Sequence, residues 1–199
     1  MITDNRDGKT YKAVTIGAQT WMAENLNFEY KVGPATYANY FDSNHPEFGR
    51  FYSWAAAMDS AGVFSKDGEG CGNRNSCTPA TTVRGLCPEG FRMPSQIDFD
   101  TLVTAIGGAL MGTKKLKSTG GWSDDGNGTD NFGFSALAVG RFDCGSFVFA
   151  GEYASFWSSN GATSEDMAWQ LLLLNTTDNL AISPINKSFG HSIRCIKAE

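Results

Sequence analysis

The sequence has few histidines, few charges and no long apolar run. Its 199 residues include two histidines, and charged residues make up 19% of the total. The apolar runs are far shorter than the ~20 residues that a membrane helix needs, which excludes a transmembrane bundle. The 16 basic residues form no block and the net charge is −5, so we expect no nucleic-acid partner. The 41% content of hydrophobic residues also argues against a disordered chain.

The sequence also lacks the common catalytic motifs. Its Gly-rich segments do not follow the strand, loop and helix pattern of a phosphate-binding loop. His45 lies in a turn-like Ser-Asn-His-Pro segment and His191 in a predicted terminal strand, and neither is close to a Gly-x-Ser-x-Gly motif. We therefore expect no enzymatic activity. No signal peptide follows Met1, so the chain is expected either to be cytoplasmic or to begin after a removed leader.

Glycine and aromatic residues are abundant, with 23 glycines and 13% aromatics, which favours a loop-rich domain. Apolar spacing predicts a hairpin over residues 11–22, a helix over 50–61, and a second helix that begins after Ser95. After Gly120 the pattern changes to short apolar runs between turn clusters. This order predicts an α+β fold in one domain, residues 1–199.

The five cysteines divide into two predicted pairs and one remaining thiol. Cys71 and Cys77 share a short Gly/Asn/Ser-rich loop, which favours a local disulfide over a zinc site. Cys87 and Cys195 both have apolar neighbours, and a bond between them would close a loop of roughly 100 residues. Cys144 is then predicted to be a buried thiol. Two disulfides imply an oxidising compartment, and therefore an extracellular or cell-surface location.

The segment from Ser123 to Asn131 is the best candidate for a metal site. Its hard oxygen atoms suit Ca²⁺, although the spacing is not that of an EF-hand and the same residue types are common in ordinary turns. A metal-free loop therefore remains the alternative, and no cofactor is otherwise expected. The candidate ligands are Asp124, Asp125, Asn127 and Asp130.

Residues 168–174 read as a strand whose two faces differ. Alternation places Trp169 with Leu171 and Leu173 on one face, and we expect that face to be buried because Trp169 has the largest apolar area. The opposite face is expected to point outward, unless a loop covers it, and to bind a partner together with the preceding loop. The predicted ligand-binding residues are Asn160, Glu165, Asp166, Gln170, Leu172 and Leu174.

Seven motifs in order resemble the Fibrobacter succinogenes major paralogous domain family, and together they cover nearly the whole chain. The first motif is Asp7-Gly-Lys-Thr-Tyr-Lys12 followed by Trp21-Met-Ala-Glu-Asn-Leu26, and the second, Gly49-Arg-Phe-Tyr-Ser-Trp-Ala-Ala-Ala-Met58, resembles the first helix of the family. The next two are Cys87-Pro-Glu-Gly-Phe-Arg-Met-Pro-Ser95 and Lys115-Leu-Lys-Ser-Thr-Gly-Gly-Trp122. The last three are Phe132-Gly-Phe-Ser-Ala-Leu137, Phe156-Trp-Ser-Ser159 and Ser192-Ile-Arg-Cys-Ile-Lys197. His191 stands where Phe or Tyr is more usual, and the resemblance implies a structural role for Trp157.

The resemblance implies a C-type lectin-like fold, with two helices, a small antiparallel sheet, long loops, and paired N- and C-terminal strands. It implies a secreted or surface protein of Bacteroidetes or Fibrobacteres that binds a protein or glycan without catalysis. A sharper form of this hypothesis is a variable protein of a diversity-generating retroelement, with residues 160–191 as the varied region. The alternatives are an enzyme similar to formylglycine-generating enzymes and a structural adhesin spacer.

Overall fold

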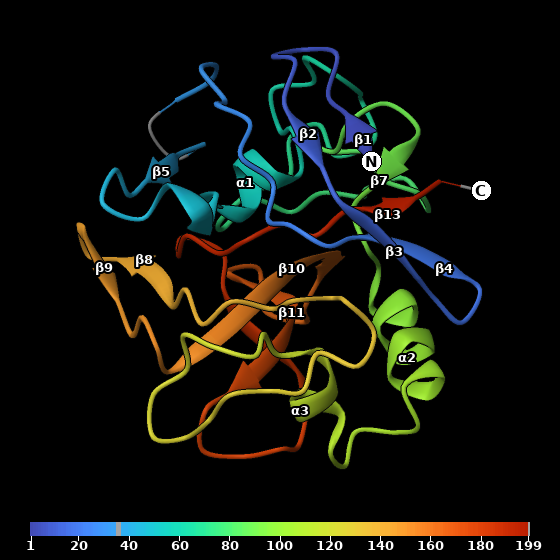
Figure 1. Ribbon diagram of the computed structural model, residues 1–199. Helices are drawn as coiled ribbons and strands as arrows, with labels where there is room; N and C mark the ends of the chain where they lie inside the picture. Colours follow the sequence, from blue (N-terminus) through green and yellow to red (C-terminus); the bar gives the residue numbers. More distant parts are fainter. Residues whose placement is uncertain (35–36, 199) are drawn as a thin grey trace.

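Five small antiparallel sheets and three short α-helices form the described part of the chain, residues 1–34 and 37–198 of a computed structural model (Figure 1). The predicted α+β class is confirmed. Short hairpins make up three of the sheets. They pair β1 (Ile2–Thr3) with β2 (Thr10–Tyr11), β5 (Asn39–Phe41) with β6 (Arg50–Tyr52), and β8 (Arg141–Asp143) with β9 (Ser146–Val148).

A four-stranded sheet joins the two ends of the chain. The predicted hairpin is present as β3 (Ala13–Ile16) and β4 (Gln19–Met22), and Gly17 makes the turn at a φ of 60° that favours glycine. The last strand, β13 (Ile196–Lys197), lies between β4 and β7 (Phe91–Arg92). The N-terminal hairpin and the C-terminal strand therefore pair, as expected, and both chain ends lie on one side of the molecule (Figure 1).

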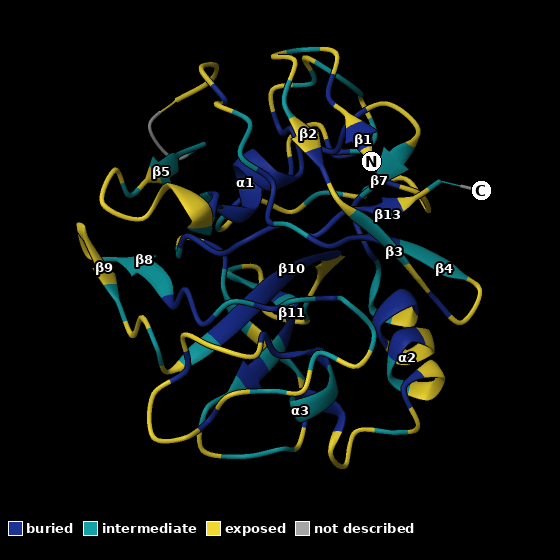
Figure 2. Cartoon of the chain, in the orientation of Figure 1, coloured by how far each residue is buried: buried dark blue, intermediate teal, exposed yellow. Residues whose placement is uncertain are grey.

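The predicted helix over residues 50–61 is mostly wrong. Residues 50–52 form β6, which follows a short 3-10 helix at Pro46–Phe48, and only α1 (Trp54–Ala57) is helical. Ser53 accepts a hydrogen bond from the Ala56 N–H at its start, and Asp59 has a left-handed φ of 54° just after its end. All four residues of α1 are buried (Figure 2), so the apolar spacing reflected complete burial rather than one face of a longer helix.

The second predicted helix is confirmed as α2 (Gln96–Ala105), and it starts with a capping box. The Ser95 side chain accepts from the Asp98 N–H, and the Asp98 carboxylate accepts from the Ser95 N–H. Arg92 donates two hydrogen bonds of 2.6 and 2.9 Å to the same carboxylate. Burial raises the pKa of Asp98, but the bonds from Arg92 and Ser95 outweigh it and leave that pKa lowered. A third helix, α3 (Gly112–Leu116), was not predicted.

The C-terminal half contains a three-stranded sheet in the order β10–β11–β12. Its strands are β10 (Tyr153–Gly161), β11 (Met167–Leu174) and β12 (Ala181–Asn186), so the predicted strand over 168–174 is confirmed. The apolar runs at residues 132–134 and 136–138 are not strands. Ala136 makes one isolated bridge to Lys117, and the runs supply buried side chains such as Phe134 from turns.

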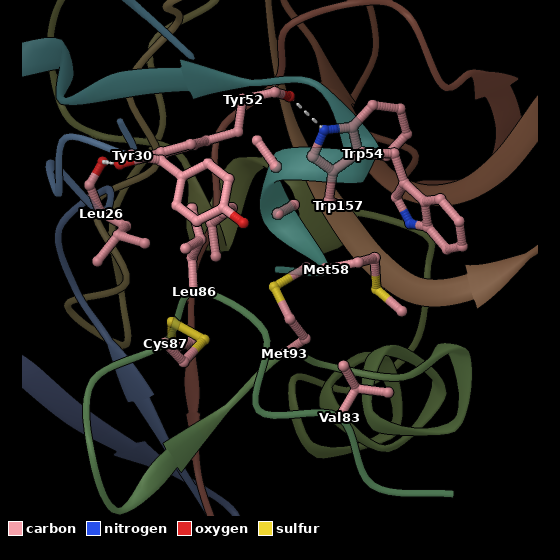
Figure 3. Packing of buried hydrophobic residues seen from close by; sticks show 14 of the residues in the cluster. Leu26, Tyr30, Tyr52, Trp54, Met58, Val83, Leu86, Cys87, Met93 and Trp157 are labelled. Atoms are coloured by element: carbon pink, nitrogen blue, oxygen red, sulfur yellow. Dashed lines mark hydrogen bonds between the residues drawn. A yellow bond between two sulfur atoms is a disulfide. The ribbon is translucent and has the colours of Figure 1, made fainter. Parts of the chain in front are cut away.

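Two hydrophobic clusters form the core, one around α1 and the other between α2 and the three-stranded sheet. Trp157 is fully buried in the first cluster and donates a 2.7 Å hydrogen bond from its indole to the Tyr52 carbonyl (Figure 3). This confirms its structural role. The second cluster includes Trp21 stacked on Phe99, with ring centroids 5.9 Å apart. None of the helices in the described residues has the length and apolar character that a bilayer crossing requires.

Both predicted disulfides are present, Cys71–Cys77 and Cys87–Cys195. The second bond lies in the first cluster, where Figure 3 shows it at Cys87, and it ties the segment before β7 to the residue just before β13. The prediction of a buried thiol at Cys144 is wrong. Cys144 is exposed in the turn between β8 and β9, where its left-handed φ of 47° helps to reverse the chain.

Candidate ligand-binding cleft

A cleft of about 450 Å³ opens where the Cys71–Cys77 loop faces the turn between β10 and β11. The loop and the segment after it contribute Asn75, Ser76, Cys77 and Pro79 to the lining. The opposite wall consists of Asn160, Gly161, Ala162, Thr163 and Glu165, with Trp54 and Lys187 completing the cleft. Its volume is within the roughly 300–1,000 Å³ of typical small-ligand sites.

Lys187 is held firmly beneath the cleft. Its ammonium lies 4.4 Å from the centre of the Trp54 ring and donates a 2.8 Å hydrogen bond to the Glu165 carbonyl. Only 4% of the residue is exposed. Burial lowers the pKa of Lys187, while the attraction of Asp166 and Glu165 opposes that shift. A fixed cation with unused N–H donors is thus available at the base of the cleft.

Two hydrogen bonds to distant segments of the chain hold Trp54 in place. Its indole donates a 2.8 Å hydrogen bond to the Ser158 carbonyl, and its backbone N–H donates to the Lys187 carbonyl at 3.0 Å. These bonds join α1 to the strand β10 and to the segment after β12. The floor of the cleft is therefore part of the hydrophobic core.

Gly161 leaves this floor open. A Cβ atom placed there would lie 3.7 Å from the Lys187 ammonium nitrogen and 3.8 Å from the Trp54 ring, which is ordinary contact distance. A larger side chain at position 161 would extend into the cleft. The backbone of Gly161 does not need glycine for its conformation, because no positive φ occurs there.

Two of the three predicted binding residues before β11 line this cleft, and Asp166 lies beside Lys187. Asn160 and Glu165 line it, and both are exposed. The carbonyl of Asp166 accepts a 2.8 Å hydrogen bond from the Lys187 backbone N–H. The Ser164 hydroxyl donates a hydrogen bond to the Asp166 carboxylate, and this bond lowers the pKa of Asp166. Lys187 and Trp54 could not be predicted as cleft residues, since no local sequence pattern relates them to residues 160–166. The Asn/Ser content of the cysteine loop was the available signal for that wall.

The remaining predicted residues lie elsewhere. Ala168 lies near the cleft, but Leu174 follows it by six residues of extended chain, so the two residues are about 20 Å apart. Leu172 and Leu174 are half-buried on the expected outer face, whereas Leu171 and Leu173 are fully buried. The six predicted ligand-binding residues therefore do not form one site.

The expected orientation of Gln170 and Trp169 is wrong. Gln170 is only 4% exposed, and Trp169 is half-buried. The reason is that β11 passes between two cores. On the face of Gln170, Ala168 packs in the first cluster with Trp157, while Leu171 packs through the opposite face in the second cluster. Each face of the strand is thus covered along a different half of its length.

The proposed metal ligands make other contacts. The Asp130 carboxylate accepts a 2.7 Å hydrogen bond from the Ser135 N–H, and the Asn127 side chain accepts one from the Trp122 N–H. The Asp124 carboxylate accepts from the Asn175 amide. Asp125 lines a separate small cleft with Asn127. Within residues 1–34 and 37–198, no cluster of three or more His, Cys, Asp or Glu side chains is arranged to hold a metal ion.

The two histidines lie in unrelated surroundings. His45 is exposed and contacts the Glu47 carboxylate at 3.1 Å. His191 is 1% exposed, and its Nδ1 is hydrogen-bonded to the Ser155 hydroxyl in the interior. Neither residue lines the cleft. Of the two late cysteines, Cys195 is disulfide-bonded and Cys144 is at an exposed turn.

Comparison with known proteins identifies the family. No curated protein and no solved structure gives a significant match. The family model described as the Fibrobacter succinogenes major domain matches residues 14–197. The match includes both walls of the cleft, the buried Trp54 and Lys187, and both disulfides. The chain therefore belongs to the Fibrobacter succinogenes major domain family.

Proposed function

We propose that this chain is a non-catalytic recognition module, located outside the cell or on its surface, that binds a protein or glycan ligand in the cleft around Gly161. The observation that carries the proposal is the convergence of Asn160, Glu165 and Lys187 on a cleft walled by a disulfide-closed loop. A floor of buried, hydrogen-bonded residues and exposed polar walls suit selective binding. The two disulfides support a location in an oxidising compartment.

We also propose a C-type lectin-like fold for the chain. Its support is the pairing of the N-terminal hairpin with the C-terminal strand, together with the long loops of the second half. In this proposal the surface of β11 that carries Leu172 and Leu174 is a second contact region for a large partner, as in an adhesin.

A variable protein of a diversity-generating retroelement is the sharper form of the proposal. Residues 160–191 include one wall of the cleft, so variation at their exposed positions would change ligand choice. The buried residues in the same range, such as Ala168 and Leu171, belong to the core clusters and would have to stay constant. The test is the DNA beside the gene. A template repeat with a reverse transcriptase gene would support this form, and their absence from the complete genome would refute it.

Binding itself is tested with a matched pair of variants at one position. Gly161→Leu places a branched side chain over Trp54 and Lys187, whereas Gly161→Ala adds one methyl group at ordinary contact distance. Both variants should fold like the parent chain. A ligand found on a glycan array or by surface-protein pull-down should bind the parent and Gly161→Ala, and should be lost with Gly161→Leu. Equal binding by both variants would refute the cleft as the site and favour a spacer role.

A further inference from the structure

We propose that the ligand is the interior of a neutral polysaccharide chain, lying in a groove that runs from the Gly161 cleft to Ile97 at the start of α2. This inference rests on the proposed function and names the ligand class for the same site.

A second cleft of about 490 Å³ adjoins the first. Pro79 and Asn160 line both clefts, so the two clefts meet at these residues. The second cleft continues along Thr81, Gln96 and Ile97. Ile97, which is 75% exposed, also lines a third cleft of about 700 Å³ beside β13. Clefts that adjoin one another at shared residues fit a linear ligand better than a single small molecule.

Asn160, which lies where the two clefts meet, is held in place by two hydrogen bonds. The Asn160 side-chain oxygen accepts a 2.7 Å hydrogen bond from the Gln96 N–H and contacts the Ser158 hydroxyl at 3.2 Å. Its NH₂ group therefore keeps its two N–H donors for a ligand. The link to α2 also fixes the distance between the two clefts, which is what a ligand with a regular repeat requires.

The side chains along the groove favour a neutral ligand rich in hydroxyl groups. Amides and hydroxyls make up five of the eight residues that line the second cleft, among them Thr81 and Gln96. They are four of the eleven that line the first, among them Asn75, Ser76 and Thr163. The described residues that line the second cleft are all uncharged. Hydroxyl groups both donate and accept hydrogen bonds, so they can pair with every one of these side chains.

The two charges in the first cleft have opposite signs. An anionic ligand would meet the Glu165 carboxylate, and a cationic ligand would meet the Lys187 ammonium. A pair of neighbouring sugar hydroxyls satisfies both charges, because one can accept from Lys187 while the other donates to Glu165. The observations therefore favour a neutral glycan over a charged polymer.

The test compares chain lengths and charges by titration calorimetry. The probes are the neutral hexasaccharides of β-1,4-glucose, β-1,4-xylose, β-1,4-mannose and α-1,4-glucose, the matching disaccharides, and hexagalacturonic acid as the anionic control. We expect at least one neutral hexasaccharide to bind about tenfold more tightly than its disaccharide, because only the longer chain occupies both clefts. Hexagalacturonic acid should bind at least about tenfold more weakly than that neutral hexasaccharide.

Two substitutions separate the clefts. Thr81→Phe narrows the second cleft from an exposed position and should lower hexasaccharide affinity to that of the disaccharide, while disaccharide binding is unchanged. Gly161→Leu should remove binding of both lengths, and Thr81→Ser and Gly161→Ala are the matched controls. Equal affinity for both lengths, equal binding of hexagalacturonic acid, or no binding of any probe would overturn the inference. A protein partner that is lost with Gly161→Leu would uphold the proposed function and still overturn the neutral-glycan groove.

Discussion

The imidazole of His191 meets the indole of Trp157 edge to face, with the ring centroids 4.7 Å apart. His191 is almost completely buried, and its Nδ1 is hydrogen-bonded to the Ser155 hydroxyl. Burial, followed by the positive charge of Arg141, lowers the pKa of His191 from 6.5 to about 3. A neutral histidine thus occupies the interior next to one of the central tryptophans.

The first prediction is that His191 makes the fold sensitive to acid. Below about pH 6.5 the unfolded chain binds a proton at this histidine, but the folded chain does so only near pH 3, so the free energy of unfolding falls as the pH falls. The loss contributed by this residue is about 2 kcal/mol between pH 7 and pH 5. His191→Phe combined with Ser155→Ala should remove it, because neither an imidazole nor an unpaired hydroxyl remains.

Urea denaturation at pH 7 and pH 5 measures this difference. The control is His45→Phe, since His45 is exposed and its side chain contacts Glu47 at the surface. That variant should keep the pH dependence of the parent chain. An unchanged pH dependence in the Ser155→Ala, His191→Phe double variant would contradict the assignment to His191.

The second prediction ranks the two disulfides. Cys87 and Cys195 are 108 residues apart, whereas Cys71 and Cys77 are 6 apart. In the chain-entropy model the long loop stabilises the fold by about 5 kcal/mol and the short loop by about 2 kcal/mol. Replacing each pair with alanines and measuring the denaturation midpoint should give the larger loss for Cys87 and Cys195. A larger loss for the Cys71 and Cys77 pair would mean that native packing around the short loop outweighs chain entropy.

The third prediction concerns the remaining thiol. Cys144 is exposed in the β8–β9 turn, and its pKa is raised by a hydrogen bond and by repulsion from Asp143. A thiol reagent in excess should therefore modify one cysteine per folded chain without denaturant, more slowly than a free cysteine at pH 7. Intact mass should place the single adduct on Cys144, and Cys144→Ser should remove it. Modification only after unfolding would show that the turn is covered in solution.

The fourth prediction compares leucines on the two faces of β11. Leu171 is fully buried in the second cluster, so Leu171→Ala should cost about 2–5 kcal/mol of unfolding free energy. Leu172 and Leu174 are half-buried, and Leu172→Ser with Leu174→Ser should cost less than Leu171→Ala alone. Chemical denaturation of the three proteins tests this order. If the double variant loses more stability than Leu171→Ala, the outer leucines belong to the core and cannot form a contact region.

The sequence by itself determined the features that depend on neighbouring residues. The turn at Gly17 specifies the hairpin β3–β4, and Ser95 with Asp98 specifies the start of α2 through a capping box. Cys71 and Cys77 are 6 residues apart in one loop, so their pairing could be predicted from the sequence. The polar residues before the leucine-rich strand indicate an exposed segment, and Asn160 and Glu165 are exposed there and line the cleft. Their role in ligand binding stays a prediction.

Only the tertiary structure decided the features that depend on distant segments. Residues 50–52 became a strand because β5 pairs with them, and Gln170 became buried because β11 passes between two clusters. Lys187 reaches the cleft because Trp54, 133 positions earlier in the chain, lies beneath its ammonium. Burial and contact across such separations arise from the packing of the whole chain. Local periodicity contains no information on which distant segments will pack together.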